Sequence, residues 1–88
     1  MRIRSIRTTP RFERSFAKLP LKLQKSIVSR KEIFASNPFS PVLKTHKLGG
    51  KLKGLWSFSV SFSHRIIFEF LDNKSVIFYD IGDHSIYR

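Results

Sequence analysis

Histidine and arginine are the side chains of this sequence best suited to chemistry at a phosphodiester. The chain has three histidines, His46, His64 and His84, and an arginine, Arg65, at the start of an apolar segment. Imidazole titrates in the useful range, and a guanidinium grips phosphate with a planar fork and keeps its proton. Because RNA supplies its own nucleophile, the 2′-hydroxyl, a base, an acid and a cation suffice to cleave it. His64 is most simply a turn residue.

Other classes of site fit the sequence less well. The absence of cysteine excludes disulfides, thiolate nucleophiles and cysteine-based metal sites. No two histidines lie four residues apart on a helix, no acidic cluster for Mg²⁺ is visible, and no serine stands in a nucleophile-elbow context. The glycines at 49, 50 and 54 do not form a phosphate-binding loop. We therefore expect neither a metal ion nor a cofactor.

Positive charge is concentrated in the first part of the chain. The 88 residues carry 17 Lys and Arg against 6 Asp and Glu, a formal net charge of +11. Residues 1–53 hold 14 basic and 2 acidic residues, whereas residues 54–88 hold 3 basic and 4 acidic ones. Such a surface suits a negative partner: nucleic acid, an acidic protein or an anionic membrane. The residues alone support a basic nucleic-acid-binding domain and leave nuclease activity open.

Length and composition indicate one folded domain over residues 1–88. Hydrophobic residues make up 41% of the chain and include nine Phe, which is enough to build a core. No run of about 18 apolar residues is present for a membrane span, and the N-terminus lacks the apolar stretch of a secretory signal. We expect a soluble, cytoplasmic protein.

A strand and two helices are predicted in the N-terminal half. Residues 2–7 alternate imperfectly and predict a short edge strand. Thr9 and Pro10 are typical of a helix N-cap and first turn, and Pro20 ends this helix and opens the next. The second helix is predicted from Leu21 to about Ala35, with one apolar face.

Three antiparallel strands are predicted after a long basic connection over residues 37–54. Residues 56–62 alternate cleanly, and residues 64–71 and 76–81 follow, joined to each other by a turn at Asp72-Asn73. The predicted class is α+β, in the order β-α-α-β-β-β, with a two-helix hairpin packed on a small antiparallel sheet.

The apolar alternation indicates how the first two of these strands pair. The even-numbered residues are apolar in residues 56–62 and again in residues 66–70. Both sets can lie on one face of the sheet only if even-numbered residues of one strand pair with even-numbered residues of the other. The loop then holds an odd number of residues, predicted as Phe62-Ser63-His64. We name the face against the helices the core face and the other the groove face. The groove face would carry Ser57, Ser59, Ser61, Arg65, Ile67 and Glu69.

The second hairpin is predicted from its turn. A two-residue turn at Asp72-Asn73 puts Asp80 opposite Arg65 on the groove face. The residues that would then join the core face are Ile77, Tyr79 and Ile81. A face with small hydroxyls and a cation suits the floor of a binding groove.

Each candidate side chain also has a structural alternative. His46 can be a solvated loop residue, and Arg65 can form a cross-strand salt bridge to Asp80. His84 and Tyr87 can belong to a frayed tail, and the lysines between residues 44 and 53 can be a solvated charge run.

The order and spacing of these motifs resemble the RelE/ParE toxin superfamily of bacterial toxin–antitoxin systems. The resemblance covers essentially the whole chain and implies the same strand, helix, helix and meander fold. The matching segments are Phe12 to Leu19-Pro20, Leu43 to Leu48 with Gly50, Gly54 to Ser57, His64 to Phe68, and Asp80 to Arg88.

In the ribonuclease branch of this superfamily, the toxin enters the ribosomal A site and cuts mRNA through the 2′-hydroxyl. The resemblance implies that His46 and His84 share the base and acid roles, in either order. It implies that Arg65 contacts the scissile phosphate and that Tyr87 closes the site or stacks on a base. The residues that would hold RNA backbone are Lys44, Lys47, Lys51 and Lys53. The implied partners are mRNA on the ribosome, rRNA and a cognate antitoxin.

Two positions depart from the family pattern. Asp83 stands where Thr or Ser is usual, and Tyr87 follows His84 by three residues where many members have four. A gyrase-poisoning branch shares the fold and does not cleave RNA, but His46, Arg65 and His84 together favour the ribonuclease branch. A non-toxic basic module that binds RNA or an acidic peptide is the third reading.

Overall fold

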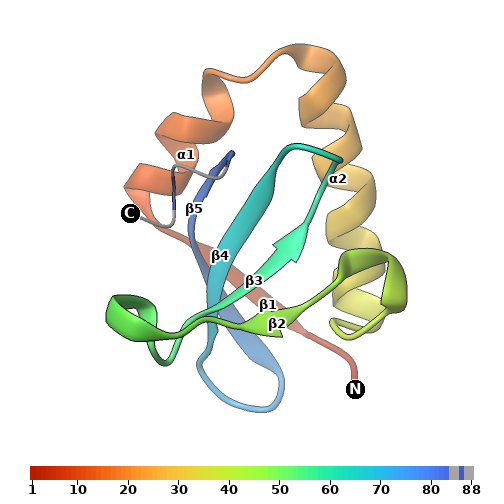
Figure 1. Ribbon diagram of the computed structural model, residues 1–88. Helices are drawn as coiled ribbons and strands as arrows, with labels where there is room; N and C mark the ends of the chain where they lie inside the picture. Colours follow the sequence, from red (N-terminus) through yellow and green to blue (C-terminus); the bar gives the residue numbers. More distant parts are fainter. Residues whose placement is uncertain (84–85, 87–88) are drawn as a thin grey trace.

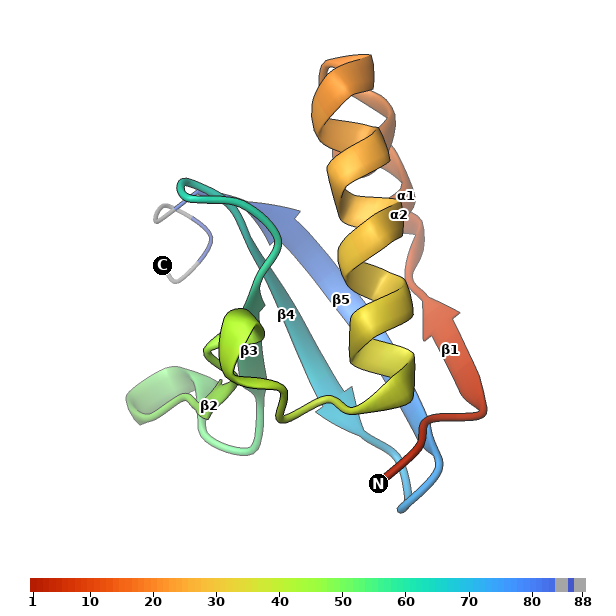
Figure 2. The ribbon, with the colours of Figure 1, turned by 90° about the vertical axis from the view of Figure 1, so that its right-hand side faces the viewer.

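Two helices and a five-stranded sheet make up the fold (Figure 1). The computed structural model describes residues 1–83 and Ile86. The sheet order is β1-β5-β4-β3-β2, and the two helices stand together on one side of it (Figure 2). The elements are β1 (Ser5–Thr8), α1 (Pro10–Ala17), α2 (Leu21–Ser36), the 3₁₀ turn η1 (Pro41–Leu43), β2 (His46–Lys47), the 3₁₀ turn η2 (Gly50–Leu52), β3 (Trp56–Ser59), β4 (Arg65–Phe70) and β5 (Ser75–Gly82). The predicted α+β class is confirmed.

Both helices begin and end close to the predicted residues. The Thr9 hydroxyl accepts a hydrogen bond from the backbone N–H of Phe12 at 3.0 Å, and Pro10 occupies the first helical turn. Helix α2 follows directly after Pro20. In the described part of the chain, neither helix is long and apolar enough to cross a membrane.

Phe34 of α2 is the centre of the core. Its ring centroid lies 4.5 Å from that of Phe58, 4.9 Å from Phe68 and 5.5 Å from Phe78, so one helix residue contacts β3, β4 and β5. All four rings are buried. Aromatic pairs of this kind contribute about 0.5–1.5 kcal/mol each beyond their buried area. The core therefore fixes the sheet against α2. On the groove face Ser57, Ser59 and Ile67 are buried as well.

The first hairpin has the predicted even-to-even register. Phe58 pairs with Ile66, and Ser59 pairs with Arg65. Strand β3 ends earlier than predicted, because the turn closes with a backbone hydrogen bond from Val60 to His64 at 3.1 Å. The loop is therefore longer than the predicted Phe62-Ser63-His64, and Phe62 lies in it, away from the core face.

The second hairpin has a different register from the prediction. In the first half of β5, Val76 and Phe78 face the core, whereas Ile77 and Tyr79 do not. The prediction that Ile77 and Tyr79 join the core face is therefore wrong.

The turn before β5 explains this difference. The Asp72 carboxylate accepts a hydrogen bond from the backbone N–H of Lys74 at 2.7 Å, and Leu71 donates its N–H to the carbonyl of Ser75 at 2.9 Å. An aspartate that bonds the backbone two residues later forms an Asx-turn, which enlarges the connection and shifts the register by one residue.

A β-bulge at Tyr79 changes the register again. Beyond it, Asp80 stands opposite Ile67, so the predicted pairing of Asp80 with Arg65 is wrong. Ile81 returns to the core, as predicted. A bulge inserts one extra residue into one strand and re-aims the side chains that follow it. Here it brings both the start and the end of β5 into the core.

The sheet is mixed, where the prediction was antiparallel. Strand β1 is an edge strand, as predicted, but it runs parallel to β5, with Ile6 opposite Val76. Parallel neighbours need a long connection, and the chain between β1 and β5 provides it. The other edge is β2, where His46 pairs with Ser57. A two-residue strand is too short for alternation to reveal it inside the predicted loop 37–54.

Candidate functional site

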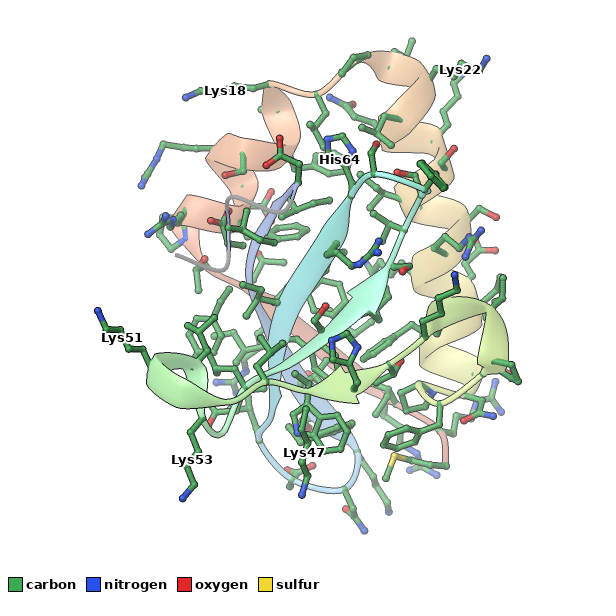
Figure 3. All side chains as sticks on the ribbon, in the orientation of Figure 1. Lys18, Lys22, Lys47, Lys51, Lys53 and His64 are labelled. Atoms are coloured by element: carbon green, nitrogen blue, oxygen red, sulfur yellow. The ribbon has the colours of Figure 1, made fainter. Side chains whose placement is uncertain are left out.

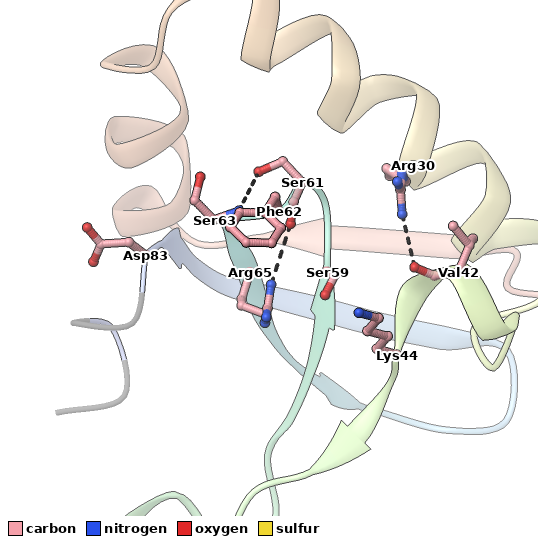
Figure 4. Close-up of a pocket in the computed structure, with 9 residues that line it drawn as sticks. All are labelled: Arg30, Val42, Lys44, Ser59, Ser61, Phe62, Ser63, Arg65 and Asp83. Carbon is pink, nitrogen blue, oxygen red and sulfur yellow. Dashed lines mark hydrogen bonds between the residues drawn. The ribbon is translucent and has the colours of Figure 1, made fainter.

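A hollow of about 900 Å³ lies between the β3–β4 hairpin, α2 and the segment after η1 (Figure 4). Its nine lining residues are Arg30, Val42, Lys44, Ser59, Ser61, Phe62, Ser63, Arg65 and Asp83. We refer to it as the basic hollow, because three cations and one carboxylate line it. Its other polar side chains are those of Ser59, Ser61 and Ser63.

The three cations of the basic hollow come from three separate elements. Arg30 belongs to α2, Lys44 follows η1, and Arg65 begins β4. Arg30 donates one Nη1 hydrogen bond to the carbonyl of Val42 at 3.0 Å. Folding therefore gathers charges that are far apart in the sequence, and such a cluster suits a multiply charged anion such as phosphate.

Among the described residues, the Arg65 guanidinium makes only weak hydrogen bonds. Its Nη1 atom lies 3.5 Å from the carbonyl oxygen of Ser61 and 3.4 Å from that of His64, which is long for a hydrogen bond. A guanidinium has five N–H donors. The donors on Nε and Nη2 have no partner among the described residues, and the side chain lines the basic hollow.

Lys44 has a strained backbone. Its φ of 51° and ψ of 40° lie in the left-handed region, where no other described residue except glycine has a positive φ. This conformation costs an ordinary residue about 1–2 kcal/mol. It turns the chain after η1 so that the Lys44 ammonium points toward Ser59 and the basic hollow (Figure 4). Strain of this kind is found at binding sites, where it orients a functional side chain.

His46 lies on the groove face next to the basic hollow. It pairs with Ser57, and the next residue of β3 on that face is Ser59, roughly 7 Å further along. Its Nδ1 atom is 2.9 Å from the carbonyl oxygen of Lys44. A carbonyl can only accept, so Nδ1 carries the hydrogen and Nε2 of the neutral ring carries the lone pair. A neutral His46 therefore has its acceptor on Nε2.

The four predicted RNA-binding lysines are divided by the fold. Lys44 lines the basic hollow. Lys47 pairs with Trp56 and lies on the opposite face, with Nζ 5.5 Å from the centre of the indole. Lys51 and Lys53 extend outward from the η2 end of the molecule (Figure 3). Of the four, only Lys44 is brought together with Arg65.

The predicted alternative of a salt bridge between Arg65 and Asp80 is wrong. Because of the bulge, Asp80 faces α1, where its carboxylate accepts hydrogen bonds from Arg11 Nε at 3.0 Å and Ser15 Oγ at 2.8 Å. His64 is in the β3–β4 loop, with Nδ1 2.9 Å from the Ser63 hydroxyl, and does not line the basic hollow. The loss of Asp80 as a partner leaves Arg65 for other ligands.

Two of the predicted catalytic residues, His84 and Tyr87, lie outside the described residues. Asp83, which directly precedes His84 in the sequence, lines the basic hollow. Within residues 1–83 and Ile86, no three His, Asp or Glu side chains gather to hold a metal ion.

Sequence reasoning missed Arg30 and Phe62. Arg30 comes three residues after buried Ile27 and four before buried Phe34, so it interrupts the apolar stripe of α2. That interruption is the signal in the sequence that Arg30 faces inward over another element. Phe62 continues the alternation of β3 in sequence, and only the early end of that strand separates it from the core.

Solved structures of bacterial toxins have this fold. A chain of the Escherichia coli DinJ–YafQ toxin–antitoxin complex is 23% identical, with a TM-score of 0.72 over 94% of each chain. A chain of the Mycobacterium tuberculosis RelBE2 toxin–antitoxin complex is 20% identical, with a TM-score of 0.76 over 91% of this chain and 96% of that one. The YoeB/ParE toxin from Agrobacterium tumefaciens is 15% identical, with a TM-score of 0.76 over 92% of this chain and 99% of that one. No family model and no curated protein matches the sequence.

Proposed function

We propose that this chain, which has the fold of the RelE/ParE toxin superfamily, is the toxin of a type II toxin–antitoxin system and cleaves mRNA on the ribosome. The observation that carries the proposal is the basic hollow, where Arg30, Lys44 and Arg65 converge beside the groove-face residue His46. Three cations next to a proton acceptor are the groups that cleavage through a 2′-hydroxyl requires.

The proposed reaction begins at His46. Its Nε2 lone pair accepts the proton of the 2′-hydroxyl, and the 2′-oxygen attacks the adjacent phosphorus. The bond from phosphorus to the 5′-oxygen breaks, and that oxygen takes a proton from the acid. His84 is assigned the acid role because the contact between His46 and Lys44 leaves His46 with a lone pair on Nε2. The products are a 2′,3′-cyclic phosphate and a 5′-hydroxyl, and no metal ion takes part.

Arg65 and Lys44 are proposed to stabilise the charge that develops in the transition state. The pentavalent phosphorane carries more negative charge than the ground-state phosphate, so donors aimed at its oxygens accelerate the step. Removing one such donor from an enzyme typically costs about 2.7–4 kcal/mol of transition-state stabilisation. Arg30, anchored through Val42, would hold a neighbouring phosphate of the same strand.

Lysines outside the basic hollow are proposed to bind ribosomal RNA backbone. Lys47, Lys51 and Lys53 lie at one end of the molecule, and Lys18 and Lys22 lie at the other (Figure 3). Charges that point in different directions cannot share one phosphate but can contact a surface made of many. This binding would weaken steeply as salt increases, because each phosphate contact releases counterions.

A cognate antitoxin is the second proposed partner. The solved structures with this fold include toxin–antitoxin complexes. A largely acidic antitoxin segment seated over the basic hollow would neutralise the three cations and block access to RNA at the same time. Toxin and antitoxin would act in the cytoplasm.

Pulse labelling after induced expression tests the proposal against its alternatives. We expect incorporation of amino acids to stop within minutes while DNA synthesis continues, and Arg65→Ala to abolish the effect. If DNA synthesis stops first and a DNA-damage response follows, the chain acts as a gyrase inhibitor. If growth continues unchanged, it is a non-toxic basic module. Either of these results contradicts the proposed function.

A further inference from the structure

Phe62 is a large apolar side chain that the folded protein does not use. It lies at the tip of the β3–β4 loop with 101% of its reference area exposed to solvent, the highest value among the large hydrophobic residues that are exposed. Burial of a phenylalanine is worth about 1.5–3 kcal/mol, and none of this is realised here. The ring therefore contributes little to the stability of the fold, which leaves it free to contact a ligand.

The loop holds Phe62 in a defined position. The Ser61 hydroxyl accepts hydrogen bonds from the backbone N–H groups of Ser63 at 3.3 Å and His64 at 3.1 Å. Val60 and His64 close the base of the loop through a backbone hydrogen bond at 3.1 Å. These bonds fix the backbone on both sides of Phe62, so little conformational entropy is lost when a ligand contacts its ring.

The surroundings of Phe62 indicate which ligand this is. The ring lines the basic hollow together with Arg65, and Figure 4 shows the two side chains on neighbouring parts of the same loop and strand. Three cations beside the ring suit a polyanion, whereas an apolar ring suits a flat, uncharged group. Single-stranded nucleic acid has both, because each phosphate is joined through its sugar to a base with an exposed π-face.

We propose that Phe62 stacks on a nucleobase of the RNA strand whose phosphate lies in the basic hollow. The inference rests on the proposed function and adds to it a specific contact with the substrate. Stacking of a base on an aromatic side chain is worth about 1–3 kcal/mol by alanine substitution, which is a factor of about 5 to 150 in affinity. Stacking tolerates any base, so Phe62 would supply affinity and register along the strand more than sequence preference.

The test uses ribosomes that carry an mRNA with 2′-deoxynucleotides in the A-site codon, which can be bound but not cleaved. One A-site base is 2-aminopurine, whose fluorescence is quenched by stacking. The proteins compared are the wild type, Phe62→Ala and Phe62→Trp, with Leu21→Ala as the matched control. Leu21 is also an exposed apolar residue, 66% exposed at the start of α2, and does not line the basic hollow.

We expect Phe62→Ala to weaken binding about 5- to 150-fold and to remove the quenching. Phe62→Trp should retain both, and Leu21→Ala should bind like the wild type. On an mRNA that lacks the base at the stacked position, the wild type and Phe62→Ala should bind equally, because neither has a base to contact. Equal affinity of the two proteins for the intact mRNA would overturn the proposal. So would a result in which Phe62→Ala binds more weakly than the wild type by the same factor on the abasic mRNA as on the intact one.

The proposal and the proposed function fail in different ways. If the wild type binds and cleaves but Phe62→Ala behaves identically, only the stacking contact is wrong. If binding depends on Phe62 but an all-ribose mRNA remains uncut, the stacking contact stands and cleavage is wrong. If the wild type does not bind programmed ribosomes at all, both are wrong.

Discussion

Arg65 and Gly82 face each other across β4 and β5, so the last residue of β5 stands beside the cation proposed to contact the scissile phosphate. Gly82 has no side chain, and the methyl group of Ile86 occupies the space where a Cβ would lie. The backbone N–H of Ile86 also donates to the carbonyl of Asp83 at 3.1 Å. Ile86 thus packs directly against Gly82, which stands opposite Arg65 and precedes Asp83 at the rim of the basic hollow.

Replacement of Gly82 by alanine is predicted to reduce the cleavage rate about 100-fold. The substitution would shift Arg65, which stands opposite Gly82, and a misplacement of a catalytic group by about 1 Å has an effect of this size. The new methyl group would collide with Ile86. To relieve the collision the backbone would shift at Gly82 and Asp83, which form the rim of the basic hollow beside Arg65. The free energy of unfolding should fall by about 0.5–3 kcal/mol, since the half-buried Ile86 must move to make room. Cleavage rates and urea unfolding curves of the same preparation check both values.

The double variant Gly82→Ala with Ile86→Ala is the control for this explanation. Removal of the Ile86 methyl group makes room for the new Cβ and should restore most of the activity. Failure of the double variant to recover would show that Gly82 acts through something other than its contact with Ile86.

Arg65→Ala is predicted to lower the cleavage rate by about 100- to 1,000-fold, the loss typical of one donor to a developing oxyanion. Its melting temperature should remain that of the wild type, because the hydrogen bonds of Arg65 to Ser61 and His64 are long and weak. Arg65→Lys should recover only part of the rate, since an ammonium lacks the planar fork. Full toxicity of Arg65→Ala would refute the assigned site.

His46→Gln is predicted to lower the cleavage rate by about 100- to 10,000-fold without loss of ribosome binding, as expected for loss of a general base. The neighbouring residue offers a matched control. Lys47 belongs to the same two-residue strand but lies on the opposite face, above Trp56. Lys47→Gln should therefore weaken binding to ribosomes but, at saturating protein, cleave bound mRNA at nearly the wild-type rate. Similar losses in the two variants would mean that β2 as a whole, and not the imidazole, is required.

Tyr79 is predicted to make stability depend on pH in the alkaline range. Its hydroxyl donates a hydrogen bond to the Glu69 carboxylate at 2.7 Å, and this bond raises the pKa of Tyr79 above its usual value of 10.0. A raised pKa favours the protonated form in the folded state. The stabilisation is therefore complete below pH 10.0 and is lost as the pH rises through the pKa of the folded protein.

Tyr79→Phe tests this dependence. At about pH 8 the variant should unfold with about 0.5–1.5 kcal/mol less free energy than the wild type, the usual value of one hydrogen bond. Above the raised pKa the difference should shrink toward zero, because the wild type has lost the same bond. A difference that stays constant between about pH 8 and pH 11 would rule out ionisation of Tyr79 as its cause.

Local signals in the sequence predicted most of the fold. Thr9 and Pro10 determine where α1 begins, through the hydroxyl cap of Thr9 and the fixed φ of Pro10. The alternation from Trp56 onward determines which face of β3 is buried. The bulge at Tyr79 could not be predicted, because the hydrogen bonds that Asp80 makes with α1 join residues more than 60 positions apart. Long-range polar contacts of this kind leave no local periodicity.

The candidate site was predictable only in part for the same reason. Arg65 could be assigned to a strand facing away from the core, but Arg30 reaches the basic hollow only because α2 packs over the β3–β4 hairpin. The division of the lysines depends on β2, whose two residues put His46 and Lys47 on opposite faces. Charge composition alone could not separate a site lysine from one at the far end of the molecule.

The central claim, cleavage through the 2′-hydroxyl, is tested most directly by mapping the cut in a 5′-labelled mRNA on purified ribosomes. We predict a cut within the A-site codon that requires ribosomes and leaves a 2′,3′-cyclic phosphate on one product and a 5′-hydroxyl on the other. One 2′-deoxynucleotide at the mapped position should abolish the cut there, because the nucleophile is then absent. An mRNA that stays intact with the wild-type protein, or a cut that persists at the deoxynucleotide, would contradict this account.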